Sequence, residues 1–290
     1  MSRSREEISL SQDGSSTKEA RQQAEKAARK ASPWIERLAR FGYLAYGVVY
    51  VLVGFLAVQA AIGGGKTASQ EGALSTVLRA PLGKVLLGLI VVGLLGYAMW
   101  RLIQGVRDPE NEGKDARGIV KRADHVVNGL FHGALALSAG QLALGGGGGS
   151  GSPDDLAAQL MSQPFGRWLI LAAGAIIIVA GLYQFRKAYK ADFRDEIKSG
   201  EMSASRKRWT TRVGRVGYVA RGVVFGVIGV FLALAALQTD PQQARGLGGA
   251  LQTLAQQPFG PYVLGTVAAG LIAYGVFMFV MARYRRIRPA

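Results

Sequence analysis

The segment RFGYLAYGVVYVLVG occupies residues 40–54 and decides the expected fold. From Gly42 onward it belongs to a run of about 20 residues with no charged side chain and no polar stripe, which is typical of a helix that crosses a membrane. Helices of soluble proteins average about 11–12 residues, so several such runs indicate a membrane protein. Six runs are present, at approximately residues 42–61, 85–104, 125–144, 168–185, 216–237 and 261–282. The sequence therefore predicts an all-α polytopic membrane protein with six transmembrane helices.

The same segment recurs later in the chain. RVGYVARGVVFGVIG at residues 215–229 aligns with it without gaps, and GALSTVLRAPLG at 72–83 matches GALQTLAQQPFG at 249–260. A weaker middle copy keeps Arg122, Gly129 and the QPFG of residues 163–166. Each unit has two spans, so successive units enter the membrane in the same orientation. We expect three parallel two-helix repeats in a pseudo-threefold bundle.

The repeats set the expected organisation of the chain. A polar tail without an apolar signal segment precedes them, and the glycine-rich stretch at 145–152 is expected to be a linker. The expected units are a partly disordered or helical cytoplasmic tail (1–33), repeat 1 (34–107), repeat 2 (118–190), repeat 3 (206–283) and a basic cytoplasmic tail (284–290).

Charge predicts the orientation. The chain has 35 Lys and Arg against 19 Asp and Glu, a formal net charge of +16, and 29 of the basic residues fall in alternate segments between the spans. The positive-inside rule then places both termini in the cytoplasm of a cell whose inner or plasma membrane holds the protein. The expected partners are anionic lipid headgroups on the cytoplasmic side and a further membrane protein. Nucleic acid is not expected, because no recognition motif accompanies the charge.

Composition and motifs exclude several chemistries. The chain has no cysteine, which excludes disulfides, zinc fingers and a thiol nucleophile. It shows no HExxH, GxSxG or Walker sequence, so we expect no enzyme and no cofactor. His125 and His132 would lie about 10 Å apart along one helix, which is too far to share a metal ion.

These repeats resemble a family of bacterial integral membrane proteins, the domain of unknown function 1206. The resemblance rests on A-R-x-G-Y-x-A-x-G-V-V-[YF] at Ala39 to Tyr50 and on G-A-L…P-x-G before each second helix. It covers residues 34–283 and implies three tandem two-helix units in a bacterial cell membrane, with no established activity. The middle unit departs from the pattern, with Asp124, His125 and Asn128 where the first has Gly42, Tyr43 and Tyr46.

Small residues recur at spacings that suit helix packing. In lipid, glycine lets two helix backbones approach closely, as in GxxxG pairs. The residues assigned to packing are Gly47, Gly54, Gly222, Gly226, Gly229, Gly265 and Gly270.

Polar side chains inside spans are costly and therefore suggest a site. His125, Asn128 and His132 share one helix face, and Arg221 is a basic residue that orientation does not require. If the repeats are related by rotation, one polar cluster forms near the cytoplasmic face from Asp124, His125, Asn128, His132, Arg221, Tyr46 and Tyr50.

Two functions follow from this cluster. As a hydrogen-bond network it belongs to a structural or partner- and lipid-interacting membrane component, and as an ion, proton or solute site it belongs to a small channel or transporter. A tightly packed axis at His132 favours the first function, whereas open polar continuity past His132 favours the second.

Overall fold

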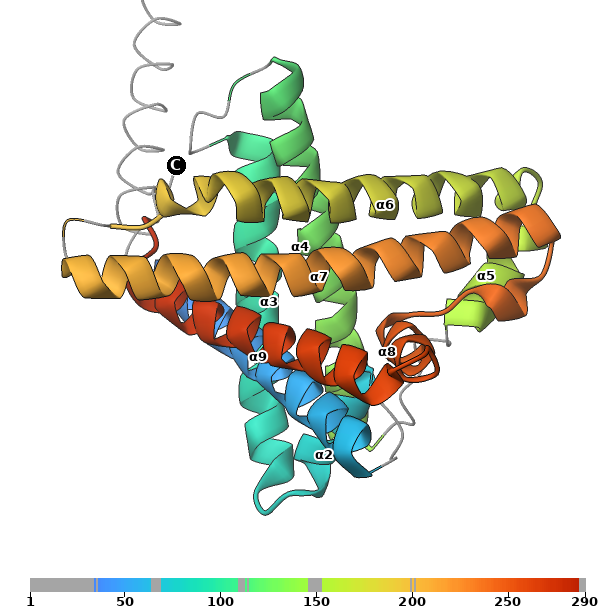
Figure 1. Cartoon of the computed structure of the whole chain (residues 1–290), viewed down its shortest axis with the longest axis horizontal. Helices are drawn as coiled ribbons and strands as arrows, with labels where there is room; N and C mark the ends of the chain where they lie inside the picture. Colours follow the sequence, from blue (N-terminus) through green and yellow to red (C-terminus); the bar gives the residue numbers. More distant parts are fainter. Residues whose placement is uncertain are drawn as a thin grey trace, which may run out of the picture.

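The computed structural model describes residues 34, 36–63, 69–108, 113, 115–145, 153–198, 200 and 202–286. This part of the chain is helical (Figure 1), apart from an isolated bridge between Ile197 and Arg285. The predicted tail at 1–33, most of the glycine-rich linker and the chain end at 287–290 lie outside the described residues.

Long helices carry the architecture, and short ones connect them. The long helices are the first helix (Glu36–Gly63), α3 (Gly83–Arg107), α4 (Ala116–Ala143), α6 (Gly166–Lys190), α7 (Ala204–Gln238) and α9 (Gly260–Tyr284). The short ones are α2 (Gln70–Arg79), α5 (Pro153–Met161), α8 (Leu247–Ala255) and the 3-10 turns η1 (Asp192–Arg194) and η3 (Pro241–Gln243).

Five of the described helices are long and apolar enough to cross a membrane. The first helix, α3, α6, α7 and α9 reach mean hydropathies of 2.0 to 2.2. Helix α4 is as long as the first helix, with 28 residues, but it does not belong to this group. Its apolar stretch is interrupted by Asn128, His132 and Gln141. The prediction of an all-helical fold is confirmed over the described residues, and five of the six predicted spans coincide with helices that are long and apolar enough to cross a membrane.

Each repeat has a short helix in the segment that connects its two long helices. Helices α2, α5 and α8 each end in a sharp turn before the next long helix. Leu82, Phe165 and Phe259 occupy corresponding places in these turns, with φ of 59°, 61° and 59°. The next residue is glycine each time, because a Cβ there would collide with the backbone of the preceding short helix. This geometry explains why P-x-G recurs in the sequence.

Repeats 1 and 3 pack internally in the same way. A Cβ on Gly42 of the first helix would lie 2.5 Å from the backbone nitrogen of Tyr97 in α3. A Cβ on the corresponding Gly217 of α7 would lie 2.6 Å from the Cα of Tyr274 in α9. Glycine therefore brings the two helices of each repeat into backbone contact.

The second helix of each repeat also packs against the first helix of another repeat. The pairs are α3 with α4, α6 with α7, and α9 with the first helix. Corresponding residues make the three contacts, since the nearest carbonyl to a Cβ placed on Gly129, Gly222 or Gly47 is that of Ala98 (3.1 Å), Gly181 (3.1 Å) or Gly275 (2.8 Å) respectively.

An arginine closes each of these contacts. Arg40, Arg122 and Arg215 occupy corresponding positions, and each donates to carbonyls at the C-terminal end of the packed helix. Such carbonyls lack helical partners and attract cations. Arg40 Nη1 reaches Ala282 and Arg283 (both 2.7 Å), Arg122 reaches Gly105 with Nε (2.9 Å) and Val106 with Nη2 (3.1 Å), and Arg215 Nη2 reaches Tyr189 (3.3 Å).

Replacing Arg122 with Ala is expected to lower the free energy of unfolding by about 1–2 kcal/mol, because charged hydrogen bonds to two helix-end carbonyls are lost. Thermal unfolding of the purified protein in detergent measures the change. Arg212→Ala is the matched control, since Arg212 is exposed on α7 and has no hydrogen bond to a described residue. Equal melting temperatures for the two variants would contradict the capping role.

The middle repeat lacks the internal contact of the other two. Helices α4 and α6 share no comparable interface, and they diverge from one another in Figure 1. Only 22% of the apolar window of α6 is buried, against 50% for α3 and α9. The sequence explains the difference, because Asp124 and Ile176 stand where repeat 1 has Gly42 and Gly93. Two bulkier side chains prevent the close approach that glycine permits.

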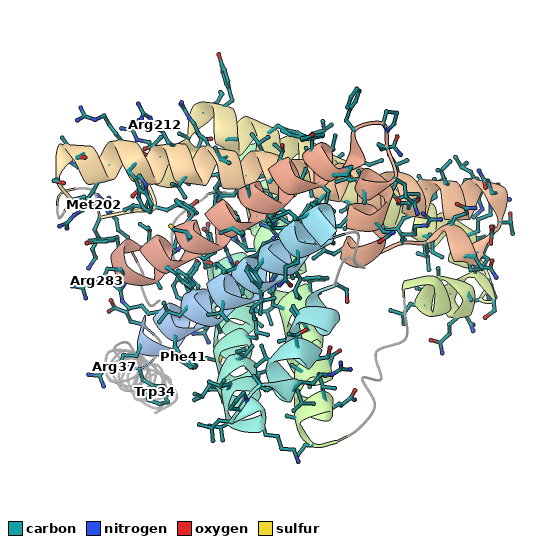
Figure 2. All side chains as sticks on the ribbon, turned by 60° about the horizontal axis from the view of Figure 1, so that its bottom comes forward. Trp34, Arg37, Phe41, Met202, Arg212 and Arg283 are labelled. Atoms are coloured by element: carbon teal, nitrogen blue, oxygen red, sulfur yellow. The ribbon has the colours of Figure 1, made fainter. Side chains whose placement is uncertain are left out.

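The basic helix ends gather at one end of the molecule. Figure 2 shows Arg37, Arg212 and Arg283 on the same side, from the first helix, α7 and α9. The short helices α2, α5 and α8 lie toward the opposite end in Figure 1, and the pair α3 and α4 crosses the pair α6 and α7. The molecule therefore has a basic end and an opposite end built from the short helices.

Candidate functional site

Arg221 lies at the meeting point of three helices. Its side chain comes from α7 and is buried, at 5% exposure. Nη1 donates to the Tyr274 hydroxyl of α9 (2.9 Å), and Nη2 donates to the Asn128 carboxamide oxygen of α4 (2.8 Å). Its guanidinium also lies 4.6 Å from the ring centre of Phe225, within cation–π range. Arg221 thus links repeat 2 to repeat 3.

Asn128 extends this link along α4. Its amide nitrogen donates to the backbone carbonyl (2.8 Å) and the carboxylate (3.0 Å) of Asp124. One turn further, Nδ1 of His132 lies 2.6 Å from the backbone oxygen of Asn128. A nitrogen at this distance from a carbonyl must carry the proton, which leaves Nε2 of a neutral His132 as an acceptor. The structure brings Asp124, Asn128, His132 and Arg221 together.

A layer of aromatic rings surrounds His132. The His132 ring packs edge-on against Tyr46, with centroids 4.3 Å apart, and against Tyr97 at 4.9 Å. Tyr46 in turn contacts Tyr50 at 4.9 Å and faces Tyr274 at 6.0 Å. His132, Tyr46 and Tyr97 have no exposed surface. The rings around His132 are therefore closely packed.

Some buried polar atoms in this region have no hydrogen-bond partner among the described residues. They are Nε of Arg221, Nε2 of His132, the hydroxyls of Tyr43 and Tyr46, and Nε1 of Trp100. A buried polar atom without a hydrogen bond costs free energy. These atoms are therefore the donors and acceptors of the core that a further polar group could satisfy.

His125 contacts a second buried arginine, Arg101, rather than Arg221. Arg101 of α3 is 7% exposed, and its Nη1 lies 2.9 Å from Nδ1 of His125. It also donates to the Tyr97 hydroxyl (2.9 Å) and the Gln104 side chain (3.3 Å). Arg101 is not among the residues of the predicted polar cluster, although it is a charge within the predicted span 85–104.

A buried ion pair holds the basic end together. Glu196, in the connection between α6 and α7, pairs with Arg285 after α9 and with Lys187 of α6, the latter at 3.1 Å. Burial raises the pKa of Glu196, but the cations Arg285 and Lys187 overcome that effect and hold the pKa well below the usual range. The sequence reading missed this pair, because only the fold brings residues 196 and 285 together.

The glycines assigned to packing divide into two groups. Gly47, Gly54, Gly222, Gly229 and Gly270 face another helix so closely that a Cβ would be within 3.1 Å of it. Gly226 and Gly265 differ, since a Cβ on Gly226 would meet nothing within 4 Å and one on Gly265 would meet only the Cβ of Ala61 at 3.9 Å. Two of the assigned positions therefore have room for a methyl group.

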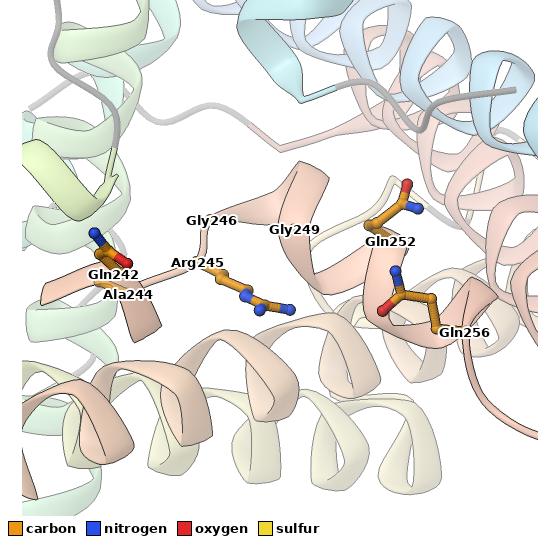
Figure 3. A pocket seen from close by; sticks show the side chains of 7 residues that line it. All are labelled: Gln242, Ala244, Arg245, Gly246, Gly249, Gln252 and Gln256. Carbon is orange, nitrogen blue, oxygen red and sulfur yellow. The ribbon is translucent and has the colours of Figure 1, made fainter. Parts of the chain in front are cut away.

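Two hollows lie away from Arg221. One, with a volume of about 470 Å³, lies between η3 and α8, where Arg245 extends past Gly249 toward Gln252 and Gln256 (Figure 3). Arg245 already donates to Thr253 (3.2 Å) and packs over Phe231. The other is an apolar groove beside the first helix. Among the described residues, no three His, Asp or Glu side chains form a set that could hold a metal ion.

The family described as Domain of Unknown Function (DUF1206) matches residues 41–108, 123–191 and 216–285. The uncharacterized protein YxxB of Bacillus subtilis (strain 168) is 37% identical over 262 residues, which cover 90% of this chain and 95% of that protein. No solved structure matches significantly. The three tandem matches confirm the resemblance inferred from the repeated motifs.

Proposed function

The chain belongs to the DUF1206 family, and from this premise we propose that it is a multi-pass cell-membrane protein that binds the transmembrane helix of a partner protein. The observation that carries the proposal is the open seam between α4 and α6. We define the seam as the exposed faces of these two helices at the positions where repeats 1 and 3 have their internal contact. The proposed role is not catalytic.

The proposed topology has six spans, with α4 as the third, and three repeats that close in a ring. Support comes from the corresponding contacts at Gly47, Gly129 and Gly222 and from the three arginine caps. The gathering of basic ends on one side supports cytoplasmic termini and contact with anionic headgroups there. Although α4 is less apolar, its Asn128 and His132 face protein, where intramembrane polar groups are tolerated.

The α4 side of the seam is an apolar face without a neighbour in the described chain. Val127 and Phe131 are 51% and 52% exposed. The corresponding residues of the first helix, Ala45 and Val49, are buried, and Ala45 packs against Gly93 of α3. Repeat 2 therefore presents a surface that repeat 1 covers with its own second helix.

The α6 side of the seam is lined by residues that suit a helix partner. Ala173 and Ile176 are exposed, and Ala180 stands where repeats 1 and 3 have Tyr97 and Tyr274. Helices in lipid associate through close van der Waals packing, and small residues permit close approach of the backbones. A transmembrane helix lying between α4 and α6 would take the place of the missing internal contact.

The hydrogen bonds of Arg221 hold α4 in place on one side of the seam. Arg221 fixes α4 to α7 and α9 through Asn128 and Tyr274, so α4 keeps its position although α6 does not support it. Asp124, one turn from Asn128, is partly exposed at the cytoplasmic end of the seam. An acidic side chain there provides a hydrogen-bond acceptor for a partner helix.

The absence of cysteine makes the experiment clean, because single-cysteine variants carry one label each. Val127→Cys and Ile176→Cys, labelled with a photoreactive maleimide in native membranes, are expected to crosslink to one discrete polypeptide. Leu95→Cys, exposed on α3 away from the seam, is the matched control and should yield none. Equal adducts at all three positions would contradict the proposal, and a product of twice the mass of the chain would replace the partner protein with a second copy.

Closing the seam should release the partner. In Asp124→Gly/Ile176→Gly, the glycines of repeats 1 and 3 are restored, so α4 and α6 are expected to pack as the first helix and α3 do. The yield of the crosslink from Val127→Cys should then fall at least about tenfold. A tenfold loss of affinity requires only that closure of the seam disfavours binding of the partner helix by about 1.4 kcal/mol. Asp124→Ala/Ile176→Val removes the same side chains without creating the glycine pair and should keep the crosslink. An unchanged yield in the glycine variant would count against the seam.

A second function is favoured by one observation, the unpartnered buried atoms of Arg221, His132 and Tyr46. In a channel or transporter these atoms would meet a passing ion or solute. Reconstituted vesicles that leak anions or protons, with the leak removed by His132→Ala or Arg221→Ala, would support this function. Vesicles as tight as protein-free ones would leave the partner-binding role.

A further inference from the structure

The hollow between η3 and α8 has a polar lining. Its volume of about 470 Å³ falls within the range of small-molecule sites, about 300–1,000 Å³. The polar groups are one guanidinium, from Arg245, and three carboxamides, from Gln242, Gln252 and Gln256. Arg245 is the only charged residue among those that line the hollow, which therefore carries a single positive charge.

Arg245 is held in place with one edge of its guanidinium available. Its side chain lies against α8, where a Cβ on Gly249 would be 2.7 Å from the Cβ of Arg245. Nη1 donates to the Thr253 hydroxyl (3.2 Å), and the guanidinium lies 4.9 Å from the ring centre of Phe231. Neither contact uses Nε or Nη2, and these two atoms have no hydrogen-bond partner in the described part of the chain. Two such parallel N–H groups match the two oxygens of a carboxylate.

The described residues supply no counter-ion to Arg245. The segment between α7 and α9 has one acidic residue, Asp240, whose carboxylate accepts from the backbone of Gln242 (3.0 Å) and the side chain of Gln243 (3.3 Å). Phe231, under the guanidinium, lies seven residues before the end of α7, about 10 Å along the helix. In the proposed topology the charge therefore lies at the outer edge of the hydrocarbon, where an unaccompanied charge is costly.

The three carboxamides surround the space next to this charge. Gln252 and Gln256 are one turn apart on the same face of α8. Figure 3 shows Arg245 extending toward these two residues, with Gln242 at the other end of the hollow. A carboxamide offers both a donor and an acceptor, so each can bind an amide or a hydroxyl group.

This arginine is specific to repeat 3. The repeat alignment places Ala68 and Gly151 at the corresponding positions of repeats 1 and 2. The fold of a repeat therefore does not need an arginine there, and in the proposed topology the positive-inside rule does not require one on this side of the membrane.

We propose that this hollow binds a small, water-soluble carboxylic acid that also carries amide or hydroxyl groups. The carboxylate lies against the Nε–Nη2 edge of Arg245, and the glutamines meet the other polar groups. A carboxylate matches the single positive charge of the lining, whereas a free phosphate carries about two negative charges at pH 7. The outer position of the site rests on the proposed topology, but the site itself is separate from the α4–α6 seam.

Equilibrium binding to the purified full chain in an uncharged detergent tests the proposal. The probes are N-acetyl-dialanine and its C-terminal amide, which differ only in the carboxylate. Glucuronate and glucose form a second pair, in which hydroxyl groups replace the amides. In at least one pair the acid should bind at least about tenfold more tightly, because the neutral probe cannot form charge-assisted hydrogen bonds. Equal binding of acid and neutral probe in both pairs, or no binding of either acid up to about 10 mM, would overturn the proposal.

Two variants show whether the acid binds in this hollow. Arg245→Gln should abolish the preference for the acid, whereas Arg206→Gln, which removes an exposed charge from the basic end, should keep it. Gln256→Trp fills the hollow from an exposed position and should remove binding even if Arg245→Gln does not fold. A preference that survives both Arg245→Gln and Gln256→Trp would contradict the assignment.

A lipid headgroup is the alternative source of the anion. Short-chain dihexanoyl phosphatidylglycerol should not displace the bound acid. Displacement at a lower concentration than that of the acid would assign the site to a lipid and overturn the proposal for a soluble ligand. Either failure leaves the proposed partner site intact, since α4 and α6 are unaltered in these variants.

Discussion

Glu196→Gln is expected to lower the free energy of unfolding at pH 7 by about 3 kcal/mol, because breaking a buried pair leaves uncompensated charge. The side chains of Arg285 and Lys187 are 1% and 12% exposed, and both pair with Glu196, which is 21% exposed. Glutamine keeps the shape of the side chain but not its charge. The melting temperature and chemical unfolding in detergent measure the loss.

The pH dependence distinguishes this charge effect from a loss of shape. The pKa of folded Glu196 is held below its value of about 4.3 in an unfolded chain, so the pair stabilises the fold at pH values above 4.3. That contribution is lost progressively as the pH falls below 4.3. The original protein should therefore lose stability faster than Glu196→Gln between about pH 5 and pH 3. Asp192→Asn, which breaks a partly exposed pair with Arg186, should cost less than about 1 kcal/mol. Parallel acid profiles for the original protein and Glu196→Gln would refute the assignment.

Gly217→Ala is expected to destabilise the protein by about 2–3 kcal/mol, a typical cost of overpacking. The new Cβ would lie 2.6 Å from the Cα of Tyr274, and a backbone atom cannot move aside as a side-chain end can. Helices α7 and α9 would have to separate along the contact that defines repeat 3. Gly42→Ala should cause a similar loss, since its Cβ would meet the backbone of Tyr97.

Gly226→Ala is the matched control, because it lies in the same helix with nothing within 4 Å of its Cβ. Ala also favours the helix over Gly by up to about 1 kcal/mol, so this variant should be neutral or slightly stabilising. The comparison is made by thermal unfolding and by the monodisperse fraction in size-exclusion chromatography. If both variants lose the same stability, helix propensity rather than backbone contact governs these positions.

The fold was predictable where it depends on long apolar runs. Five spans and the three repeats follow from hydrophobicity and self-similarity, signals that need no tertiary information. Helices α2 and α8 were not predicted, because G-A-L…P-x-G served only to identify the repeats. Their Ser75 and Thr253 hydroxyls donate to the carbonyls of Gly72 and Gly249 within the helices. The crossing of the helix pairs depends on which glycines face which backbones, and a single sequence does not contain those pairings.

The site was predictable only in part, for a physical reason. His125, Asn128 and His132 stand out as polar residues within an apolar stretch, and Arg221 as a charge inside a span. Arg101 carries the same signal, a charge inside a span, but is not part of the predicted cluster. Glu196 gave no signal, because its partner Arg285 is 89 residues away.

The departure of the middle repeat was visible at Asp124, but its meaning was not. An aspartate at the position of Gly42 indicates, by itself, only that this position is polar in repeat 2. Only together with Ile176, on the second helix of the same repeat, does it describe a contact that cannot form. The seam is thus a property of two residues on different helices, and neither predicts it alone.

The arginine caps can form only in a certain order during synthesis of the chain. Arg122 receives its carbonyls from a helix made just before it, whereas Arg40 must wait for carbonyls of Ala282 and Arg283, 242 and 243 residues further along the chain. At about 5–20 residues per second, the ribosome needs roughly 12–50 s to deliver them. During that interval Arg40 has its local ion pair with Glu36 of the same helix but not the carbonyls of α9. A truncated product ending before α9 would lack these carbonyls, so the start of its first helix would differ from that of the complete chain.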